Sequence, residues 1–142
     1  MLRCAAEAPE LATRAGATAQ IAWSHEYTAG ALYLLGQLDE AMVMSFRAAA
    51  AFKGIGDVDS YVQSLAHVAN CPRDGGRHAE ALEQFLTLLE LMDGEGSGMT
   101  PSVVAHSRPF ALIRVGQCLG HLGRRAEAIA ALGTAMELLD AP

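Results

Sequence analysis

The sequence contains little that would build a β-sheet, and it has few aromatic side chains. Only 6% of its 142 residues are aromatic, and Val, Ile and Thr together number 17, too few for a sheet-rich domain. The apolar content of 51%, which excludes disorder of the whole chain, is carried instead by small side chains, with 27 Ala beside 14 Gly. Because Ala is the best helix former, this composition predicts an all-α protein whose helices approach one another closely.

Positive charge is also scarce. Lys53 is the one lysine, and the net charge is −6, which disfavours direct binding to nucleic acid or to an anionic membrane. No apolar run approaches the roughly 18 residues that a bilayer-spanning helix needs. Glu7, Pro9 and Glu10 fall where the apolar region of a signal peptide would lie. We therefore expect a cytoplasmic protein without membrane contacts.

The cysteines and histidines follow no pattern of a metal site or a catalytic centre. Cys4, Cys71 and Cys118 are widely spaced, and no Cys-x-x-Cys or His-x-x-x-His motif occurs. Cys118 and His121 lie three residues apart, but two ligands do not make a zinc site. We expect no metal, no cofactor and no catalytic residue, and hence a protein that is not an enzyme.

One short pattern occurs three times. The segments Gly36–Ala41, Gly76–Ala81 and Gly123–Ala128 all read Gly-x-x-x-Glu-Ala, and their glycines are 40 and 47 residues apart. Gly16 and Gly56 each precede one of these glycines by 20 residues. The spacing predicts a repeat of about 40 residues that contains two helices joined by a tight glycine turn.

The helices expected from this reading cover residues 4–15, 17–35, 38–54, 57–71, 77–92, 102–121 and 125–139. Asp57 and Thr100 are suitable N-cap residues, and Pro101 suits a first helical position. The chain is expected to be a single domain, with a leftover helix at 1–16, repeats at 17–55, 56–93 and 102–142, and a flexible linker at 94–101.

Aligned on its turn glycine, each unit resembles a tetratricopeptide repeat. The matching small residues are Ala29, Ala69 and Gly116 in the first helix of each unit, and Ala41, Ala81 and Ala128 in the second. Small residues at helix crossings let the two axes approach closely. The resemblance implies a right-handed superhelical stack of antiparallel helix pairs, an α-solenoid. Pro72 departs from the family pattern and is expected to end its helix early.

The long repeat bears on function, since tetratricopeptide repeats usually have about 34 residues. Units of about 40 residues resemble those of bacterial signalling proteins and transcription regulators. The resemblance implies a scaffold that binds a protein or peptide in the concave groove. One alternative is a regulatory domain of a bacterial transcription regulator that senses a ligand or a signal peptide. A third reading is an enzyme accessory.

In such arrays the first helix of each unit lines the groove. The groove positions are occupied here by Trp23, Glu26, Tyr33, Gln63, Asn70, Arg73, Phe110, Ile113, Gln117 and His121. The three aromatic residues of this set are equally well explained as partly buried packing residues.

Some family members clamp a carboxylate with a cation and an amide on successive helices. The cation positions hold Glu26, Ala66 and Ile113 here, so only Asn70 matches and the clamp is disfavoured. Arg73 and Arg114 remain a hypothesis for pairing with an acidic ligand.

The last expected helix has an apolar face without a partner. Its members are Ile129, Leu132, Met136 and Leu139. An exposed apolar patch usually marks an interface, so we expect self-association, as a homodimer, through this helix.

Overall fold

A computed structural model describes residues 2–93 and 98–140, and describes side chains from residue 14 onward. Within these ranges the chain forms six α-helices and no β-strand. The helices are α1 (Leu2–Leu34), α2 (Leu38–Gly54), α3 (Val58–Asp74), α4 (His78–Asp93), α5 (Pro101–His121) and α6 (Arg125–Asp140). The all-helical class predicted from the Ala content is confirmed.

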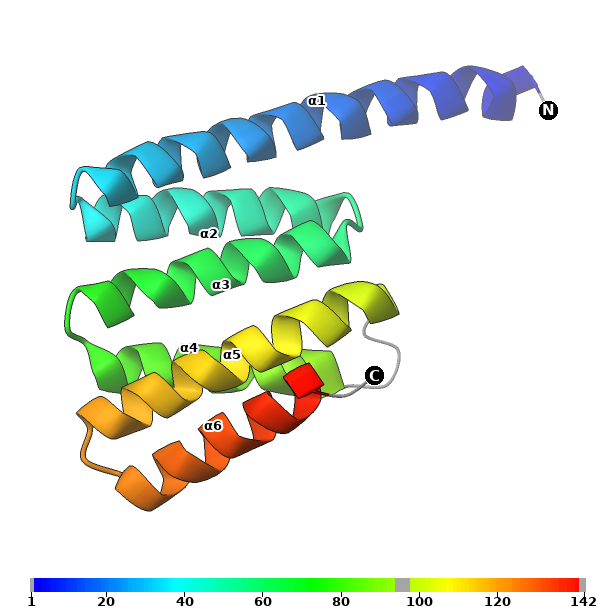
Figure 1. Cartoon of the computed structure of the whole chain (residues 1–142). Helices are drawn as coiled ribbons and strands as arrows, with labels where there is room; N and C mark the ends of the chain where they lie inside the picture. The colour runs from blue at the N-terminus through cyan, green and yellow to red at the C-terminus, as the bar shows by residue number, and fades with distance from the viewer. Residues whose placement is uncertain (1, 94–97, 141–142) are drawn as a thin grey trace.

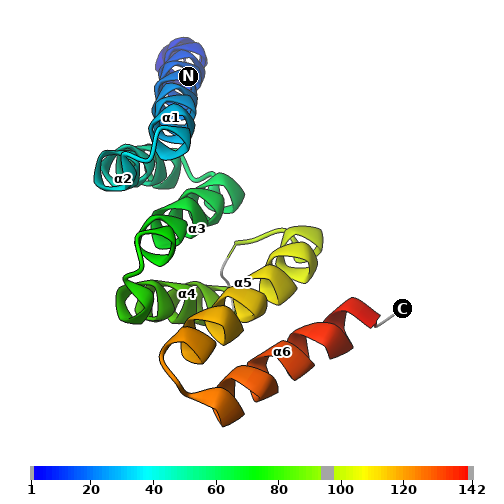
Figure 2. The same ribbon diagram turned by 60° about the vertical axis from the view of Figure 1, so that its left-hand side comes forward.

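The helices are packed in the order of the sequence. Each one contacts the next along the chain, and α3 also contacts α5 (Figures 1 and 2). The N-terminal part of α1 projects past its neighbours (Figure 1). Each helix therefore has its sequence neighbours on either side. The contact of α3 with α5 shows that alternate helices also come together.

Glycine turns end four of the helices. Gly36, Gly56, Gly76 and Gly123 all have φ between 77° and 81°, a left-handed conformation that favours glycine. The next amide donates to the carbonyl five residues earlier each time, as in the bond of 2.9 Å from Gln37 to Leu32. The predicted glycine turns are therefore confirmed, and they set the length of each helix.

Gly16 does not interrupt the first helix. Residues expected to form two helices, 4–15 and 17–35, form the single helix α1 of 33 residues. Gly16 has no positive φ, and no heavy atom lies within 4 Å of the position of an added Cβ. A glycine inside a helix costs only about 1 kcal/mol relative to alanine, so it weakens a helix without ending it.

Pro72 does not end α3 either. The helix was expected to stop at residue 71, but it continues through Pro72 to Asp74. Pro72 lies in the last turn, where Gly75 donates to the carbonyl of Cys71 and Arg77 donates to that of Pro72. The proline removes a single N–H donor, and these bonds satisfy the carbonyls of Cys71 and of Pro72 itself.

The predicted side-chain cap is confirmed at Asp57, whereas Thr100 occupies the N-cap position of α5 without a side-chain cap. The side chain of Asp57 accepts a bond of 3.2 Å from the amide of Ser60 and caps α3. Thr100 precedes Pro101 at the start of α5, but its hydroxyl donates to Asp59 of α3 at 2.7 Å. Residues 94–97 of the expected linker lie outside the described residues.

The hydrophobic core is divided unequally. A large cluster joins α3, α4, α5 and α6 around Phe85, which is fully buried. A second cluster has three buried members, Ala22, Ala48 and Phe52 of α1 and α2, and the partly buried Tyr61 of α3 packs against it. Most of the apolar burial is therefore in the part of the molecule after α2.

The small residues expected at helix crossings are buried. Ala41, Ala69 and Ala81 are at most 1% exposed. At Gly116 an added Cβ would lie 2.7 Å from Cγ of Leu132, closer than real Cβ atoms come. Gly116 therefore permits the close contact of α5 with α6. None of the described helices is both long enough and apolar enough to cross a membrane.

Candidate functional site

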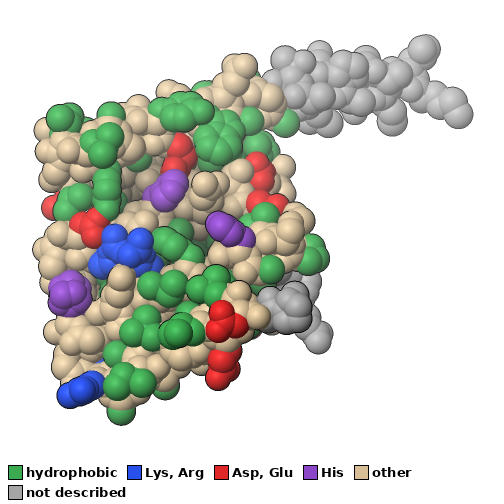
Figure 3. Space-filling view, viewed as in Figure 1, with side chains coloured by type: hydrophobic (Ala, Val, Ile, Leu, Met, Phe, Trp, Pro, Cys, Tyr) green, Lys and Arg blue, Asp and Glu red, His purple; other side chains and the backbone are tan. Residues whose placement is uncertain are grey.

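Two pockets lie side by side along α1, α3 and α5. The first, the charged pocket, has a volume of about 310 Å³ and lies between α1 and α3, with Arg114 reaching it from α5. The second, the apolar pocket, has about 490 Å³ and lies between α3 and α5. His67 and Asn70 line both, so the two pockets adjoin along α3, and together they are called the groove. Figure 3 shows basic, acidic and histidine side chains close together among hydrophobic ones on this face.

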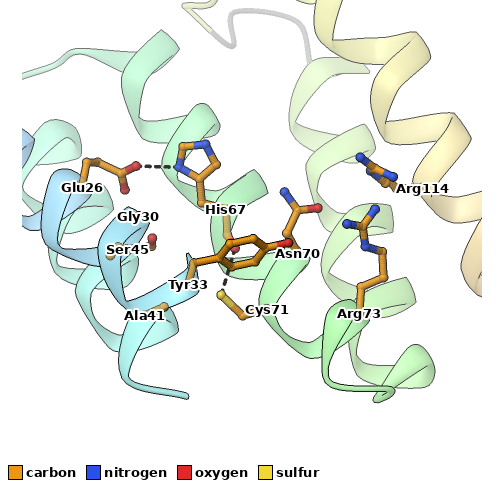
Figure 4. Close-up of a pocket in the computed structure, with 11 residues that line it drawn as sticks. Glu26, Gly30, Tyr33, Ala41, Ser45, His67, Asn70, Cys71, Arg73 and Arg114 are labelled. Atoms are coloured by element: carbon orange, nitrogen blue, oxygen red, sulfur yellow. Dashed lines mark hydrogen bonds and ion pairs between the residues drawn. The ribbon is translucent and has the colours of Figure 1, made fainter. Parts of the chain in front are cut away.

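A buried carboxylate lies at one end of the charged pocket. Glu26 of α1 is 9% exposed, and its Oε2 lies 2.5 Å from Nδ1 of His67 on α3 (Figure 4). The other oxygen, Oε1, is buried and has no hydrogen-bond partner among the described residues. A carboxylate has acceptor sites for several donors, so Glu26 has unused hydrogen-bonding capacity.

The middle of the charged pocket is formed by Tyr33 and Asn70 (Figure 4). Oδ1 of Asn70 is also buried without a partner in the described chain. The Cys71 thiol beneath it donates to the carbonyl of His67 at 3.3 Å. Two acceptor oxygens, from Glu26 and Asn70, are therefore available in one pocket.

Two arginines form the other end. Arg73 of α3 and Arg114 of α5 point toward one another (Figure 4). Arg114 donates to Oε1 of Gln117 at 2.9 Å, and Arg73 donates to the same oxygen at 3.5 Å. Arg73 also pairs with Asp74 at 2.8 Å, whereas no described carboxylate pairs with Arg114. Nε of Arg114 is buried without a partner in this part of the chain.

The electrostatics of this end favour an anion. Burial lowers the pKa of both guanidinium groups below its ordinary value. The Arg73 cation lowers the pKa of Arg114 further, because like charges repel. A bound anion would offset the repulsion between the two cations, of which Arg73 is already paired with Asp74.

The apolar pocket offers different chemistry. Val62, Leu88, Met92 and Phe110 supply apolar surface, and Gln63 lies at its edge. Phe110 is 36% exposed, and the Arg114 guanidinium lies 4.7 Å from the centre of its ring. An apolar side chain of a ligand fits this half of the groove.

The thiols near the groove are unsuited to nucleophilic chemistry. Burial raises the pKa of Cys71 and of Cys118, which keeps both in the neutral thiol form. Among the described residues, no group of three or more His, Cys, Asp or Glu side chains is placed to hold a metal ion.

The predicted groove residues fall into two sets. Six of them line the pockets: Glu26, Tyr33, Gln63, Asn70, Arg73 and Phe110. The other four line neither pocket: Trp23, Ile113, Gln117 and His121.

Each of the other four has a different environment. The ring of Trp23 packs edge-on against Phe52 at 5.1 Å, as the packing alternative predicts. His121 stacks on His78 with ring centres 4.1 Å apart, and Ile113 is half-buried in α5. Gln117 lies at the rim of the charged pocket through its bonds to the arginines.

The residues proposed for self-association are on the surface of α6. Ile129, Met136 and Leu139 are each more than 60% exposed, and Leu132 is 36% exposed. Self-association through this face stays a prediction.

Sequence reasoning missed His67, which contacts Glu26 and lines both pockets. The signal was its spacing: Gln63, His67 and Asn70 are separated by four and then three residues, so they share one face of α3. Arg114 was expected, with Arg73, only as a hypothesis for pairing with an acidic ligand, and the structure places both residues in the charged pocket.

Comparison with known proteins gives no match: no protein-family model and no curated protein matches this sequence. The function is therefore argued from the groove itself.

Proposed function

We propose that this chain is a non-enzymatic binding module that holds a protein segment or peptide in the groove along α1, α3 and α5. The proposal includes a tetratricopeptide-like architecture, a right-handed stack of antiparallel helix pairs. The observation that carries it is the continuity of the two pockets through His67 and Asn70. A single ligand can occupy both pockets, with backbone groups near the polar end and a side chain against Phe110.

The surface chemistry supports a peptide as the ligand. Tyr33 and Phe110 provide aromatic anchors, and Gln63 and Asn70 provide amide groups for main-chain hydrogen bonds. Buried oxygens of Glu26 and Asn70 without partners favour a ligand that brings donors.

The test is selection of binders from a random peptide library on the immobilised chain, followed by affinity measurement in solution. Phe110→Ala is expected to weaken the selected peptides at least tenfold, because it removes an aromatic anchor. Phe46→Ala is the matched control, since Phe46 is 48% exposed on α2 and lines neither pocket. Equal affinities for the wild type and both variants would contradict the proposal.

A second candidate, a ligand-sensing domain of a bacterial transcription regulator, is favoured by the size of the charged pocket. Its volume of about 310 Å³ lies within the range of about 300–1,000 Å³ typical of small-molecule sites. A thermal shift caused by small metabolites, together with no selected peptide, would favour this candidate over the peptide scaffold.

A further inference from the structure

The charged pocket has opposite charges at its two ends. Glu26 and His67 lie at one end, and Arg73 with Arg114 at the other, with Tyr33 and Asn70 between them (Figure 4). The arrangement is held by packing, since Glu26 is 9% exposed and Arg73 and Arg114 are both half-buried. A ligand that fits this pocket needs a positive group and a negative group in fixed relation.

The Glu26 end is suited to an ammonium group. Oε2 of Glu26 is engaged by His67, whereas Oε1 is buried and has no described partner. Oδ1 of Asn70 is also buried without a described partner, but Figure 4 shows it on the side of Asn70 that faces the arginines. An ammonium has three N–H donors and no acceptor, so it matches the unpartnered oxygen of the Glu26 carboxylate.

The arginine end is suited to a carboxylate. Two guanidinium groups face the same space, and Gln117 bridges them from the rim. Nε of Arg114 is a buried donor without a described partner, and Asp74, the ion-pair partner of Arg73, acts on Arg114 through its charge without a close ion pair. Arginine donors bind carboxylates through paired hydrogen bonds, which gives both affinity and orientation.

The spacing along α3 sets the length of the ligand. His67, Asn70 and Arg73 follow one another at intervals of three residues and so share one face of the helix. His67 and Arg73 are six residues apart, so their Cα atoms are separated by about 9 Å along the axis of α3. An extended peptide covers about 3.3–3.6 Å per residue, so two to three residues span it.

From these contacts we infer that the charged pocket binds the free ammonium and free carboxylate of a di- or tripeptide. The inference rests on the proposed function and deepens it, because it names the ligand of one half of the groove. A longer chain that presents an ammonium and a carboxylate at the same separation has the same chemistry. The experiment below distinguishes these two sources.

The experiment is calorimetric titration of the whole chain with dialanine and trialanine and with three forms of trialanine: N-acetylated, C-amidated and blocked at both ends. We expect dialanine, trialanine or both to bind, and each single block to weaken trialanine at least tenfold. The doubly blocked form carries neither charge and is expected not to bind. Doubly blocked Lys-Ala-Asp presents an ammonium and a carboxylate on side chains within a chain, and binding of it as tight as that of trialanine would overturn the assignment to free termini. Because the derivatives probe the wild-type protein, this arm does not depend on any variant folding.

Two variants assign the ends. Glu26→Gln should bind free and N-acetylated trialanine equally and still bind the C-amidated form more weakly. Arg114→Gln should bind free and C-amidated trialanine equally and still bind the N-acetylated form more weakly. Glu83→Gln and Arg47→Gln are matched controls on α4 and α2, because both side chains are exposed and line neither pocket. Both controls are expected to bind trialanine as the wild type does.

Absence of binding by dialanine and trialanine, or equal binding of free and blocked trialanine, would overturn the inference. If library peptides still bound with dependence on Phe110, the proposed groove function would survive that failure. If free trialanine bound and library peptides did not, the charged pocket would be a small-ligand site without a peptide groove.

Discussion

The part of the molecule formed by α1 and α2 differs from the part formed by α3 to α6 in what its side chains do. The second part contains the large core cluster around Phe85, while the first has only Ala22, Ala48 and Phe52. The first part supplies Glu26 and Tyr33 to the charged pocket. The second supplies the apolar pocket and the two arginines. Burial that stabilises the fold is thus concentrated away from the buried carboxylate of Glu26.

This contrast explains how a buried, partly unsatisfied carboxylate is accommodated. An unpaired polar group costs about 1–3 kcal/mol, and more when it is charged. Because α2 packs on α3, contacts outside the α1–α2 pair contribute to offsetting this cost. The larger core beyond α3 provides the stability that the α1–α2 part lacks.

The largest expected effect compares the two buried phenylalanines. Phe85→Ala removes a fully buried ring from the large cluster and is expected to lower the free energy of unfolding by about 3–5 kcal/mol. Phe52→Ala is expected to cost less, because its cluster is small, and to affect mainly α1, α2 and the start of α3, where Tyr61 packs on that cluster. Hydrogen exchange should show loss of protection across α3–α6 in the first variant and mainly in α1–α2 in the second. The same protection pattern in both variants would remove the distinction between the two parts.

The next effect tests the close contact of α5 with α6. In Gly116→Ala the new Cβ would lie 2.7 Å from Leu132, and overpacking of this kind costs about 1–3 kcal/mol. Gly120→Ala on the same helix meets no heavy atom within 4 Å and is expected to stabilise by up to about 1 kcal/mol. Chemical denaturation measures both variants. A stabilising Gly116→Ala would show that this crossing does not require glycine.

The third effect concerns the weaker part. His67→Ala leaves the buried Glu26 carboxylate without its one described partner and is expected to cost about 1–3 kcal/mol. Adding Glu26→Gln should recover part of this loss, since the uncompensated charge is gone. His25→Ala is the control, because His25 on α1 has no described ion pair. Equal effects of the two histidine substitutions in thermal denaturation would argue against a stabilising Glu26–His67 pair.

The smallest effect is a dependence on pH. Burial raises the pKa of Cys71 and Cys118 in the folded chain, so unfolded thiols ionise at lower pH than folded ones. The free energy of unfolding should therefore fall as the pH rises above about 8.5, where an unperturbed thiol ionises. The decrease should be shallower in the double variant Cys71→Ala/Cys118→Ala. Identical slopes would mean that the folded thiols titrate normally.

Much of the fold was predictable because it depends on local chemistry. The turn glycines, the small residues at Ala41, Ala69 and Ala81, and the cap at Asp57 all act through short-range sterics or hydrogen bonds. Gly16 misled the prediction because glycine has two roles, one in left-handed turns and one inside helices. Only tertiary packing separates these roles.

The site was less predictable than the fold. Helix position identified Glu26, Asn70 and Arg73, which line the charged pocket, but it also placed Trp23 and His121 in the groove. Those two rings instead pack against Phe52 and His78, residues on other helices. Such pairings depend on how the helices are rotated against one another, which a single sequence does not encode locally.

The most direct test of the proposed groove is chemical-shift mapping of backbone amides while a library-selected peptide is titrated into the labelled chain. The proposal predicts the largest shifts at the residues shared by both pockets, His67 and Asn70, and along the faces of α1 and α5 that line them. Amides around Phe46 on α2 and Leu86 on α4, which line neither pocket, should move least. Shifts concentrated around Phe46 and Leu86, with none at His67 and Asn70, would contradict the proposed function.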